Sequence, residues 1–173
     1  MYNPIKVMIT EEMLSKSSER DHGKYNDKSF MNGLGNIPGF LGEYILADIR
    51  PDLKHVFTSY DYDFLQADGN TTVDSKCKTH KVPKAPLWNH EASICVDSLH
   101  QQVDNYVFSR VYYDKLNGCY PYGWIIGGIS KKEFFEKARP LKKGQRDGDN
   151  GYVVRQDCYN FHYLNLHPIK IKQ

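Results

Sequence analysis

The chain has 173 residues, of which 40% are hydrophobic and 25% are charged, a balance that suits one globular domain with a buried core. Its formal net charge of +2 is too small to predict a strongly basic nucleic-acid-binding surface. No run of 18 apolar residues occurs, and the N-terminal residues lack the apolar core of a secretory signal. We therefore expect a cytoplasmic protein without a membrane partner.

The cysteine content fits a reducing compartment. Four cysteines occur without other signs of secretion, so we expect free thiols rather than disulfides. A zinc site is an alternative, because Cys77-x-x-His80 and Cys158-x3-His162 carry suitable ligand types. Their spacing is too loose to be typical of a zinc site.

The first predicted helix begins after Thr10 and extends to about Glu19. Thr10 is a suitable N-cap residue, and the two glutamates that follow it favour the positive end of the helix dipole. Residues 20–36 are polar and contain glycine, which predicts a loop. Lys24 and Lys28 of this loop are candidates for contacts with a phosphate backbone, and a solvated linker is an equally good interpretation.

Residues 36–48 have the pattern of a second helix that carries one acid. Asn36 is a suitable N-cap, and apolar residues recur at helical spacing. Glu43 lies one turn from Gly39 and one turn from Ala47, a small-residue row that would let the helix approach another backbone with Glu43 pointing at it. The alternative is a surface glutamate on an amphipathic helix. The predicted buried stripe consists of Ile37, Phe40, Leu41, Tyr44 and Ile45.

A β-hairpin is predicted around the dipeptide Asp68-Gly69, which suits a two-residue turn with positive φ. This turn would place Asp63 directly opposite Asp74. A turn displaced by one residue would place Asp63 opposite Lys76 instead. The two strands are expected at His55–Phe64 and Thr71–Lys78.

Two carboxylates that face each other across a sheet repel, and the pair is destabilising unless a cation compensates it. Side chains alternate along a strand, so Asp63, Asp74 and Lys76 share one face, and the Lys76 ammonium compensates part of the charge. A divalent ion such as Mg²⁺ would compensate it better, because Mg²⁺ prefers carboxylate oxygens and keeps several waters. The alternative is a solvated hairpin face with scattered charge.

Residues 79–92 contain two prolines and no clear hydrophobic period, which predicts a loop near the same face. Lys78, Lys81 and Lys84 form a candidate DNA-contact strip at this loop. A rigid connector without such contacts is an equally good interpretation.

The second half of the chain predicts two long strands, a short helix and a final strand. Ser130 and Glu133 match a capping box, and Pro140 would end the helix that follows. Asn117-Gly118 marks a turn between the long strands. The strands are expected at Val103–Asp114, Tyr120–Ile129 and Tyr152–Arg155, and the C-terminal tail is expected to dock through Leu164 and Leu166.

Together these elements predict a single α/β domain over residues 1–173. The domain would have a central mixed β-sheet that contains the hairpin and the strands near residues 105 and 125. Helices near residues 11–20, 38–48 and 131–138 would flank this sheet.

The order of the acidic residues resembles the PD-(D/E)XK nuclease superfamily, which has the restriction-endonuclease-like fold. The resemblance rests on Glu43 in the first core helix, Asp63 on the next strand, and Asp74-Ser75-Lys76 on the returning strand. It covers residues 30–140, where later segments also resemble the family. These are Gln101-Gln102 with residues 104–108, and residues 123–127 with residues 130–135.

The resemblance implies a small Mg²⁺-dependent nuclease that hydrolyses DNA, of the kind found in bacteriophages or in bacterial DNA processing. Mn²⁺ would substitute for Mg²⁺. By position, Asp63, Asp74 and the Ser75 carbonyl would be metal ligands, and Glu43 would hold metal-bound water or a second ion. Lys76 would orient the attacking water and stabilise charge. Many such enzymes are homodimers, and a phage-encoded member would act in the host cytoplasm.

Two other interpretations stay open. One is a nucleic-acid-binding module on the same fold without turnover, and the other is a metal-binding or protein-interaction protein with no role on DNA. No segment is typical of base-edge recognition, so the sequence predicts neither a sequence preference nor the form of the substrate.

Overall fold

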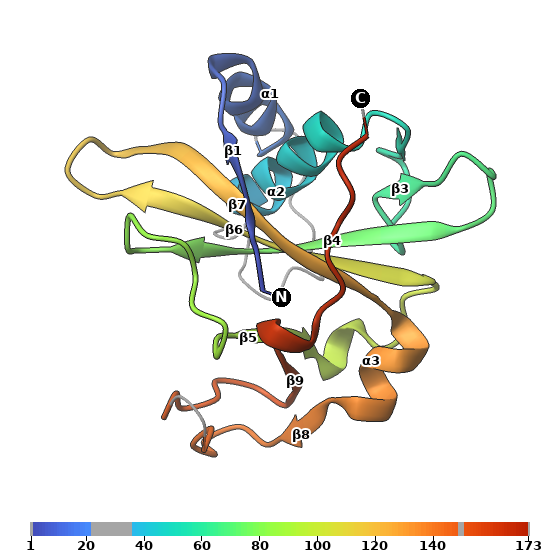
Figure 1. Cartoon of the computed structure of the whole chain (residues 1–173), viewed down its shortest axis with the longest axis vertical. Helices are drawn as coiled ribbons and strands as arrows, with labels where there is room; N and C mark the ends of the chain where they lie inside the picture. The colour runs from blue at the N-terminus through green and yellow to red at the C-terminus, as the bar shows by residue number, and fades with distance from the viewer. Residues whose placement is uncertain (1, 22–35, 149–150, 173) are drawn as a thin grey trace.

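The computed structural model describes residues 2–21, 36–148 and 151–172, and this part of the chain is a mixed α/β structure (Figure 1). The main sheet has the strand order β1-β7-β6-β4-β3-β2, and a second sheet has the order β5-β9-β8. The strands are β1 (Ile5–Met8), β2 (Lys54–His55), β3 (Phe64–Leu65), β4 (Thr72–His80), β5 (Glu91–Cys95), β6 (Asn105–Asp114), β7 (Cys119–Ser130), β8 (Arg139–Leu141) and β9 (Cys158–His162). The helices are α1 (Glu11–Asp21), α2 (Asn36–Ile49) and α3 (Lys131–Lys137), with 3₁₀ turns η1 (Val96–Ser98) and η2 (Tyr163–Asn165).

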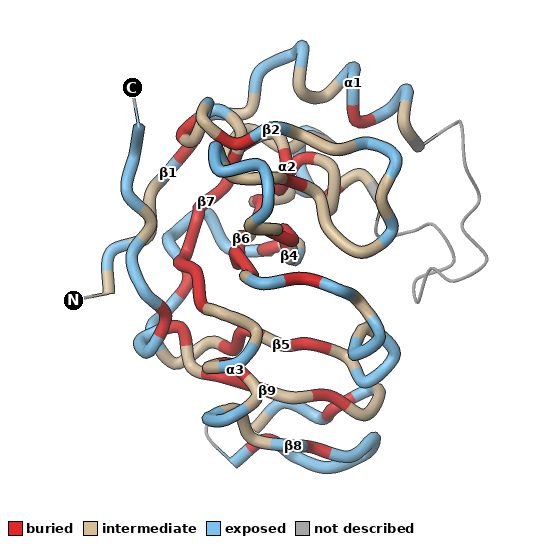
Figure 2. Tube along the Cα trace, turned by 90° about the vertical axis from the view of Figure 1, so that its right-hand side faces the viewer, coloured by how far each residue is buried: buried red, intermediate tan, exposed pale blue. Residues whose placement is uncertain are grey.

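The main sheet lies between two layers. Helices α1 and α2 cover one face, and the second sheet with α3 covers the other (Figure 1). Buried residues concentrate on β7, β6 and β4 and in the layers beside them (Figure 2). One core cluster joins α2 to the sheet through Leu41, Ile45 and Val111, and the other joins the sheet to the lower layer through Phe108 and Phe134. The predicted α/β class is therefore confirmed.

Strand β4 has a different partner on each side. It runs parallel to β6, with Asp74 beside Tyr106, and antiparallel to β3, which pairs only with Thr72 and Val73. From Ser75 onward, no other described strand covers the β3 side of β4. Parallel neighbours need a crossover connection, and here the crossover contains β5 and η1.

The hairpin register is confirmed, but its turn differs from the prediction. Leu65 pairs with Thr72 as predicted, and the ladder ends at Phe64 and Val73, the neighbours of Asp63 and Asp74. The Asp63 N–H donates a 3.0 Å hydrogen bond to the Val73 carbonyl, so Asp63 lies next to Asp74 where the regular pairing ends. The hairpin is closed by a 2.9 Å hydrogen bond from Gln66 N to Thr71 O, which makes a four-residue loop in which Gly69 has positive φ. The Asp68 side chain stabilises this longer loop by accepting hydrogen bonds from the backbone of the two residues after Gly69. The loop is symmetric about the predicted turn, which explains why the register is unchanged.

The single strand predicted at His55–Phe64 is wrong. The segment folds back on itself, so that His55 pairs with Phe64 and the residues between them form a loop. The Ser59 hydroxyl accepts hydrogen bonds from the backbone N–H groups of Asp61 and Tyr62, at 3.1 and 3.3 Å, and competes with strand pairing. The consequence is that His55 lies beside Phe64, with ring centroids 4.5 Å apart.

Near the C-terminus, the predicted strand at Tyr152–Arg155 is also wrong. Val153 forms only an isolated bridge with Arg146, and the last strand is instead Cys158–His162. Asparagine in the middle of that strand is a poor β-former, which hid it in the sequence. Leu166 docks as predicted, whereas Leu164 is exposed. The two long strands, the turn at Gly118 and the Ser130 cap of α3 are confirmed.

Helix α2 approaches the sheet at Gly42, not along the predicted row of Gly39 and Ala47. A Cβ atom at Gly42 would lie 2.9 Å from Ser109 Oγ and still closer to Cys77 Cβ, whereas a Cβ at Gly39 would meet nothing within 4 Å. The helix is therefore rotated from the predicted orientation. Leu41 and Ile45 of the predicted stripe are fully buried, Leu46 and Ile49 are also buried, and Ile37, Phe40 and Tyr44 are only half-buried. No helix in the described ranges is long and apolar enough to span a membrane.

We predict opposite effects for alanine at the two glycines of α2. Gly42→Ala should lower the free energy of unfolding by about 1–3 kcal/mol, because the added methyl group overlaps Cys77. Gly39→Ala should raise it by about 0.5–1 kcal/mol, because the position is open and alanine favours the helix. Urea unfolding of both variants measures the difference, and equal effects would contradict the packing at Gly42.

Candidate active site

Asp63 lies at the end of the loop between β2 and β3, where β3 begins to pair with β4. One of its carboxylate oxygens accepts a 2.8 Å hydrogen bond from the Ser75 backbone N–H. This N–H lies just beyond the part of β4 that β3 covers, so it needs an acceptor other than a strand carbonyl. The bond fixes the Asp63 carboxylate against the β4 backbone, next to Asp74.

Asp74 and Lys76 form an ion pair on one face of β4. Lys76 Nζ lies 2.6 Å from Asp74 Oδ2, and Asp74 is only 5% exposed. This oxygen makes no hydrogen bond of regular geometry, so the contact with the ammonium is mainly electrostatic. Lys76 Nζ also donates a 2.9 Å hydrogen bond to Gln101 Oε1. Gln101 therefore helps to position the ammonium beside the carboxylate.

Glu43 has different partners. The Glu43 side chain of α2 is buried. Its carboxylate accepts a 2.7 Å hydrogen bond from Arg20 of α1 and lies 2.6 Å from His55 Nε2. The His55 ring stacks on Phe64 and contacts Phe57. Glu43 is thus neutralised by Arg20 at the junction of α1, α2 and β2.

The three acids still influence one another. Burial raises the pKa of Asp63 well above its ordinary value, and the negative charges of Asp74 and Glu43 raise it further. The Ser75 N–H and the Lys76 ammonium oppose this rise in pKa only in part. The site therefore carries more negative charge than its cations compensate.

Within the described residues, no three or more histidine, cysteine, aspartate or glutamate side chains are grouped closely enough to hold a metal ion together. The cysteines and histidines of the loose zinc pattern therefore do not form such a group in the described residues. Glu43, which has its own partners, does not form one with the adjacent pair Asp63 and Asp74. The structure brings together Asp63, Asp74, Ser75 and Lys76 of the predicted site and places Glu43 beside them.

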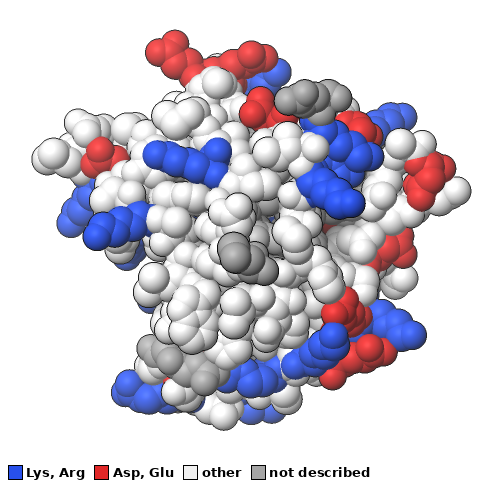
Figure 3. Space-filling view, in the orientation of Figure 1, with Lys and Arg blue, Asp and Glu red and all other residues white. Residues whose placement is uncertain are grey.

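The candidate DNA-contact lysines lie in different places. Lys78 is on β4, on the same face as Lys76, and Lys81 and Lys84 are exposed in the connection after β4. Lys24 and Lys28 lie outside the described residues. On the described surface that Figure 3 shows, lysine and arginine lie in separate groups among acidic residues and uncharged surface. On this face, DNA contacts would therefore depend on local groups of lysines and not on a broad basic surface.

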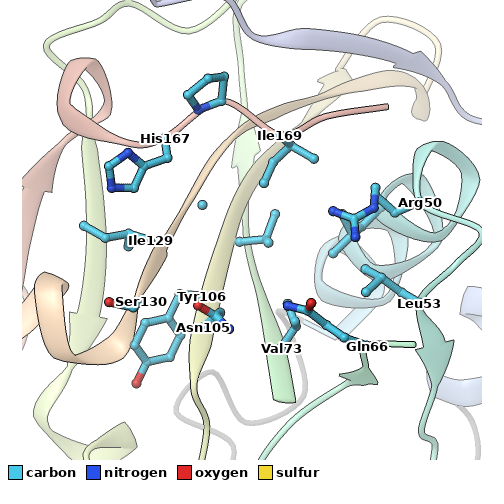
Figure 4. Close-up of a pocket in the computed structure, with 14 residues that line it drawn as sticks. Arg50, Leu53, Gln66, Val73, Asn105, Tyr106, Ile129, Ser130, His167 and Ile169 are labelled. Carbon is cyan, nitrogen blue, oxygen red and sulfur yellow. The ribbon is translucent and has the colours of Figure 1, made fainter. Parts of the chain in front are cut away.

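A cleft of about 210 Å³ adjoins the site between β4 and β5. Lys76 and Lys78 line one wall, and Ser93 lines the other. A second cavity, also about 210 Å³, lies on another side of the main sheet beneath the C-terminal tail (Figure 4). Arg50 of that lining is paired with Asp52, and no lysine, aspartate or glutamate in the described part of the chain lines the cavity. The cleft beside Lys76 is therefore the better candidate for a functional site.

Sequence reasoning missed three residues that hold the site. Arg20 and His55 bind Glu43, and Gln101 binds Lys76, yet each is distant in sequence from its partner. Of these three residues, only Gln101 had a sequence signal that could have linked it to the site. It begins the segment that resembles the strand after the nuclease motif. Comparison of the chain with family models, curated proteins and solved structures finds no match. The resemblance to nucleases stays a prediction.

We predict that Asp63→Asn stabilises the protein at neutral pH. The folded-state pKa of Asp63 is raised above its ordinary value of 3.8, so the ionised carboxylate costs stability as pH rises from that value toward the raised pKa. The asparagine side chain keeps an acceptor for the Ser75 N–H and carries no charge. The melting temperature of the variant should exceed that of the wild type at pH 7.5, by about 2–4 °C for each kcal/mol gained, and the difference should vanish near pH ~3.

Asp68→Asn is the matched control. Hydrogen bonds from Thr71 lower the pKa of Asp68, so its ionised form adds stability that is lost as pH falls. Thermal melts of this variant should show the opposite sign at pH 7.5. A pH-independent difference for Asp63→Asn would contradict the charge imbalance.

Proposed function

We propose that the protein is a Mg²⁺-dependent nuclease that hydrolyses phosphodiester bonds in DNA. The observation that carries the proposal is the adjacent pair of the half-buried Asp63 and the buried Asp74, with the Lys76 ammonium 2.6 Å from Asp74. A pair of carboxylates with insufficient compensation has a high affinity for a small, hard cation. A lysine at the same position supplies a donor for a phosphate oxygen.

The donor set fits Mg²⁺ chemically. Proteins commonly bind Mg²⁺ through one or two carboxylates, and water and substrate phosphate complete the coordination. Asp63 and Asp74 would supply these carboxylates, with the Ser75 carbonyl and Glu43 as further oxygen groups and Mn²⁺ as a substitute ion. When bound, such an ion stabilises negative charge on a phosphate and makes water more acidic.

The residues of the chain have separate roles in this proposal. Asp63 is fixed by Ser75, so its carboxylate is preorganised. Lys76 is partly exposed and held by Gln101, which lets its ammonium leave Asp74 and contact a phosphate oxygen as charge develops there. Lys76 therefore acts as an electrostatic and orienting group in the hydrolysis.

One observation favours a rival interpretation, a structural ion-pair cluster in a nucleic-acid-binding module without turnover. Asp74 and Glu43 each already have a cationic partner within 2.7 Å. Buried acids with such partners also occur in sites that have no catalytic role. The two interpretations differ in turnover and in the response to Mg²⁺.

The expected result for Lys76→Ala is a loss of cleavage of about 10²–10³-fold, because one preorganised charge at the phosphate is removed. DNA cleavage is measured on duplex, single-stranded and branched substrates with Mg²⁺. Lys132→Ala on α3, which removes an exposed lysine that pairs with Glu136 of the same helix, is the control and should cleave like the wild type. Unchanged turnover in Lys76→Ala, or no turnover by the wild type on any substrate, would refute the proposal.

Mg²⁺ binding is tested separately by thermal shift. Mg²⁺ should raise the melting temperature of the wild type and of Lys76→Ala, because the binding of a ligand to the folded state stabilises it. It should have no such effect on Asp63→Asn or Asp74→Asn, which lack a carboxylate of the pair. An equal shift in all four proteins would show that the ion binds elsewhere.

A further inference from the structure

The cleft beside the candidate site lies where the main sheet meets the second sheet. Strand β4 forms one side of the cleft and β5 the other, and the two strands lie in adjacent layers (Figure 2). Lys76 and Lys78 project from the same face of β4 into this region. The cleft therefore begins at Ser75, next to Asp74 in the chain, and follows a row of two ammonium groups.

The positive charge of this row is only partly compensated. Lys78 Nζ donates a 2.8 Å hydrogen bond to the Ser93 hydroxyl, and among the described residues Lys78 forms no ion pair with a carboxylate. Glu91 also lines the cleft, but Arg139 at 2.8 Å and His162 at 3.0 Å hold its carboxylate. Lys78 is exposed at the cleft, and the surrounding protein together with the nearby charge of Arg110 lowers its pKa to about 8. An anion in the cleft would reach this ammonium and offset the repulsion from Arg110.

An exposed aromatic residue lies next to the same row. Gln101, which accepts from Lys76 Nζ, also donates a 3.3 Å hydrogen bond to the backbone carbonyl of Tyr60. Tyr60 is 78% exposed, and its ring stacks on no other aromatic ring in the described part of the chain. Phe57 of the same loop is 59% exposed. Aromatic rings in this setting are suitable platforms for unpaired bases, whose faces are accessible only outside a duplex.

The depth of the site also limits what can reach it. Asp74 and Ser75 are buried, and the cleft that Ser75 lines has a volume of only about 210 Å³. In a duplex, each backbone is attached to a second strand, which restricts how far a phosphate can enter a recessed site. A single strand carries its phosphates on a narrow, flexible chain and can expose its bases to Tyr60 at the same time.

We propose that the cleft along Lys76 and Lys78, together with Tyr60, binds an unpaired nucleotide strand. The substrate class is then single-stranded nucleic acid or the single-stranded end of a duplex, with phosphates along the two lysines and a base on the tyrosine ring. The proposal specifies the substrate of the nuclease proposed above and rests on that function, but its binding step is measurable without cleavage.

Binding is tested by fluorescence anisotropy in EDTA, which prevents divalent-ion-dependent cleavage. The probes are one labelled DNA oligonucleotide, the same oligonucleotide annealed to its complement, and the RNA of the same sequence. The wild type should bind the single strand at least tenfold more tightly than the duplex. Tighter binding of RNA than DNA would support the unpaired strand as ligand and overturn DNA as the substrate.

Three variants assign the binding to these residues. Tyr60→Ala should weaken single-strand binding about 5- to 100-fold, and Tyr60→Phe should restore it, because stacking requires only the ring. Lys78→Ala should weaken binding and reduce the slope of log K against log salt by about 0.7, the value expected for one phosphate contact on a single strand. Lys132→Ala, the control, should leave both quantities unchanged.

The outcomes separate this inference from the proposed function. Equal affinity for duplex and single strand, or unchanged binding by Tyr60→Ala and Lys78→Ala, overturns the inference even if the protein cleaves DNA. Loss of binding in these variants supports the inference even if the wild type shows no turnover with Mg²⁺. The absence of turnover would instead refute the proposed nuclease function.

Discussion

The close contact of α2 with β4 at Gly42 is the constraint on which the candidate site depends. Without a side chain at this position, the helix backbone comes within contact distance of Cys77 and Ser109. The next residue, Glu43, is thereby carried to the edge of the sheet, where β3 leaves β4. A wider separation would move this acid away from Asp63 and leave the interlayer space unfilled.

This contact creates an electrostatic problem that the surrounding elements solve only in part. Helix α1 supplies Arg20, and the folded-back segment after α2 supplies His55. Both side chains contact the Glu43 carboxylate. The other two acids, Asp63 and Asp74, have one ammonium group nearby, that of Lys76. Burial and repulsion then raise the pKa of Asp63, so the excess charge is concentrated on the carboxylate next to β4. This repulsion lowers the stability of the fold, and a bound cation would relieve it. Such a local loss of stability is typical of a binding site.

The sequence was informative where local physics determined the outcome. Helical spacing, the Ser130 cap and the Asp68-Gly69 signal predicted two helices and the Leu65–Thr72 register of the hairpin correctly, and this register ends at Phe64 and Val73, next to Asp63 and Asp74. It failed where long-range contacts decided the structure. The rotation of α2 depends on which glycine meets β4, and the second sheet depends on pairing β5 with β9, more than sixty residues later in the chain.

The same division applies to the site. Asp63, Asp74 and Lys76 could be predicted from spacing within one hairpin, whereas Arg20, His55 and Gln101 come from segments that tertiary packing alone brings near. The fold of the 56–63 loop also had no strong sequence signal, because the serine hydroxyl that bends it resembles any other serine in a polar segment. That bend has a functional consequence. It presents Tyr60 to solvent and joins its backbone to Lys76 through Gln101, so the loop that positions Asp63 also extends the site outward. Negative charge at the inner end and ammonium groups along the cleft then give the site a polarity that a phosphate chain, with a cation bound at its inner end, would match.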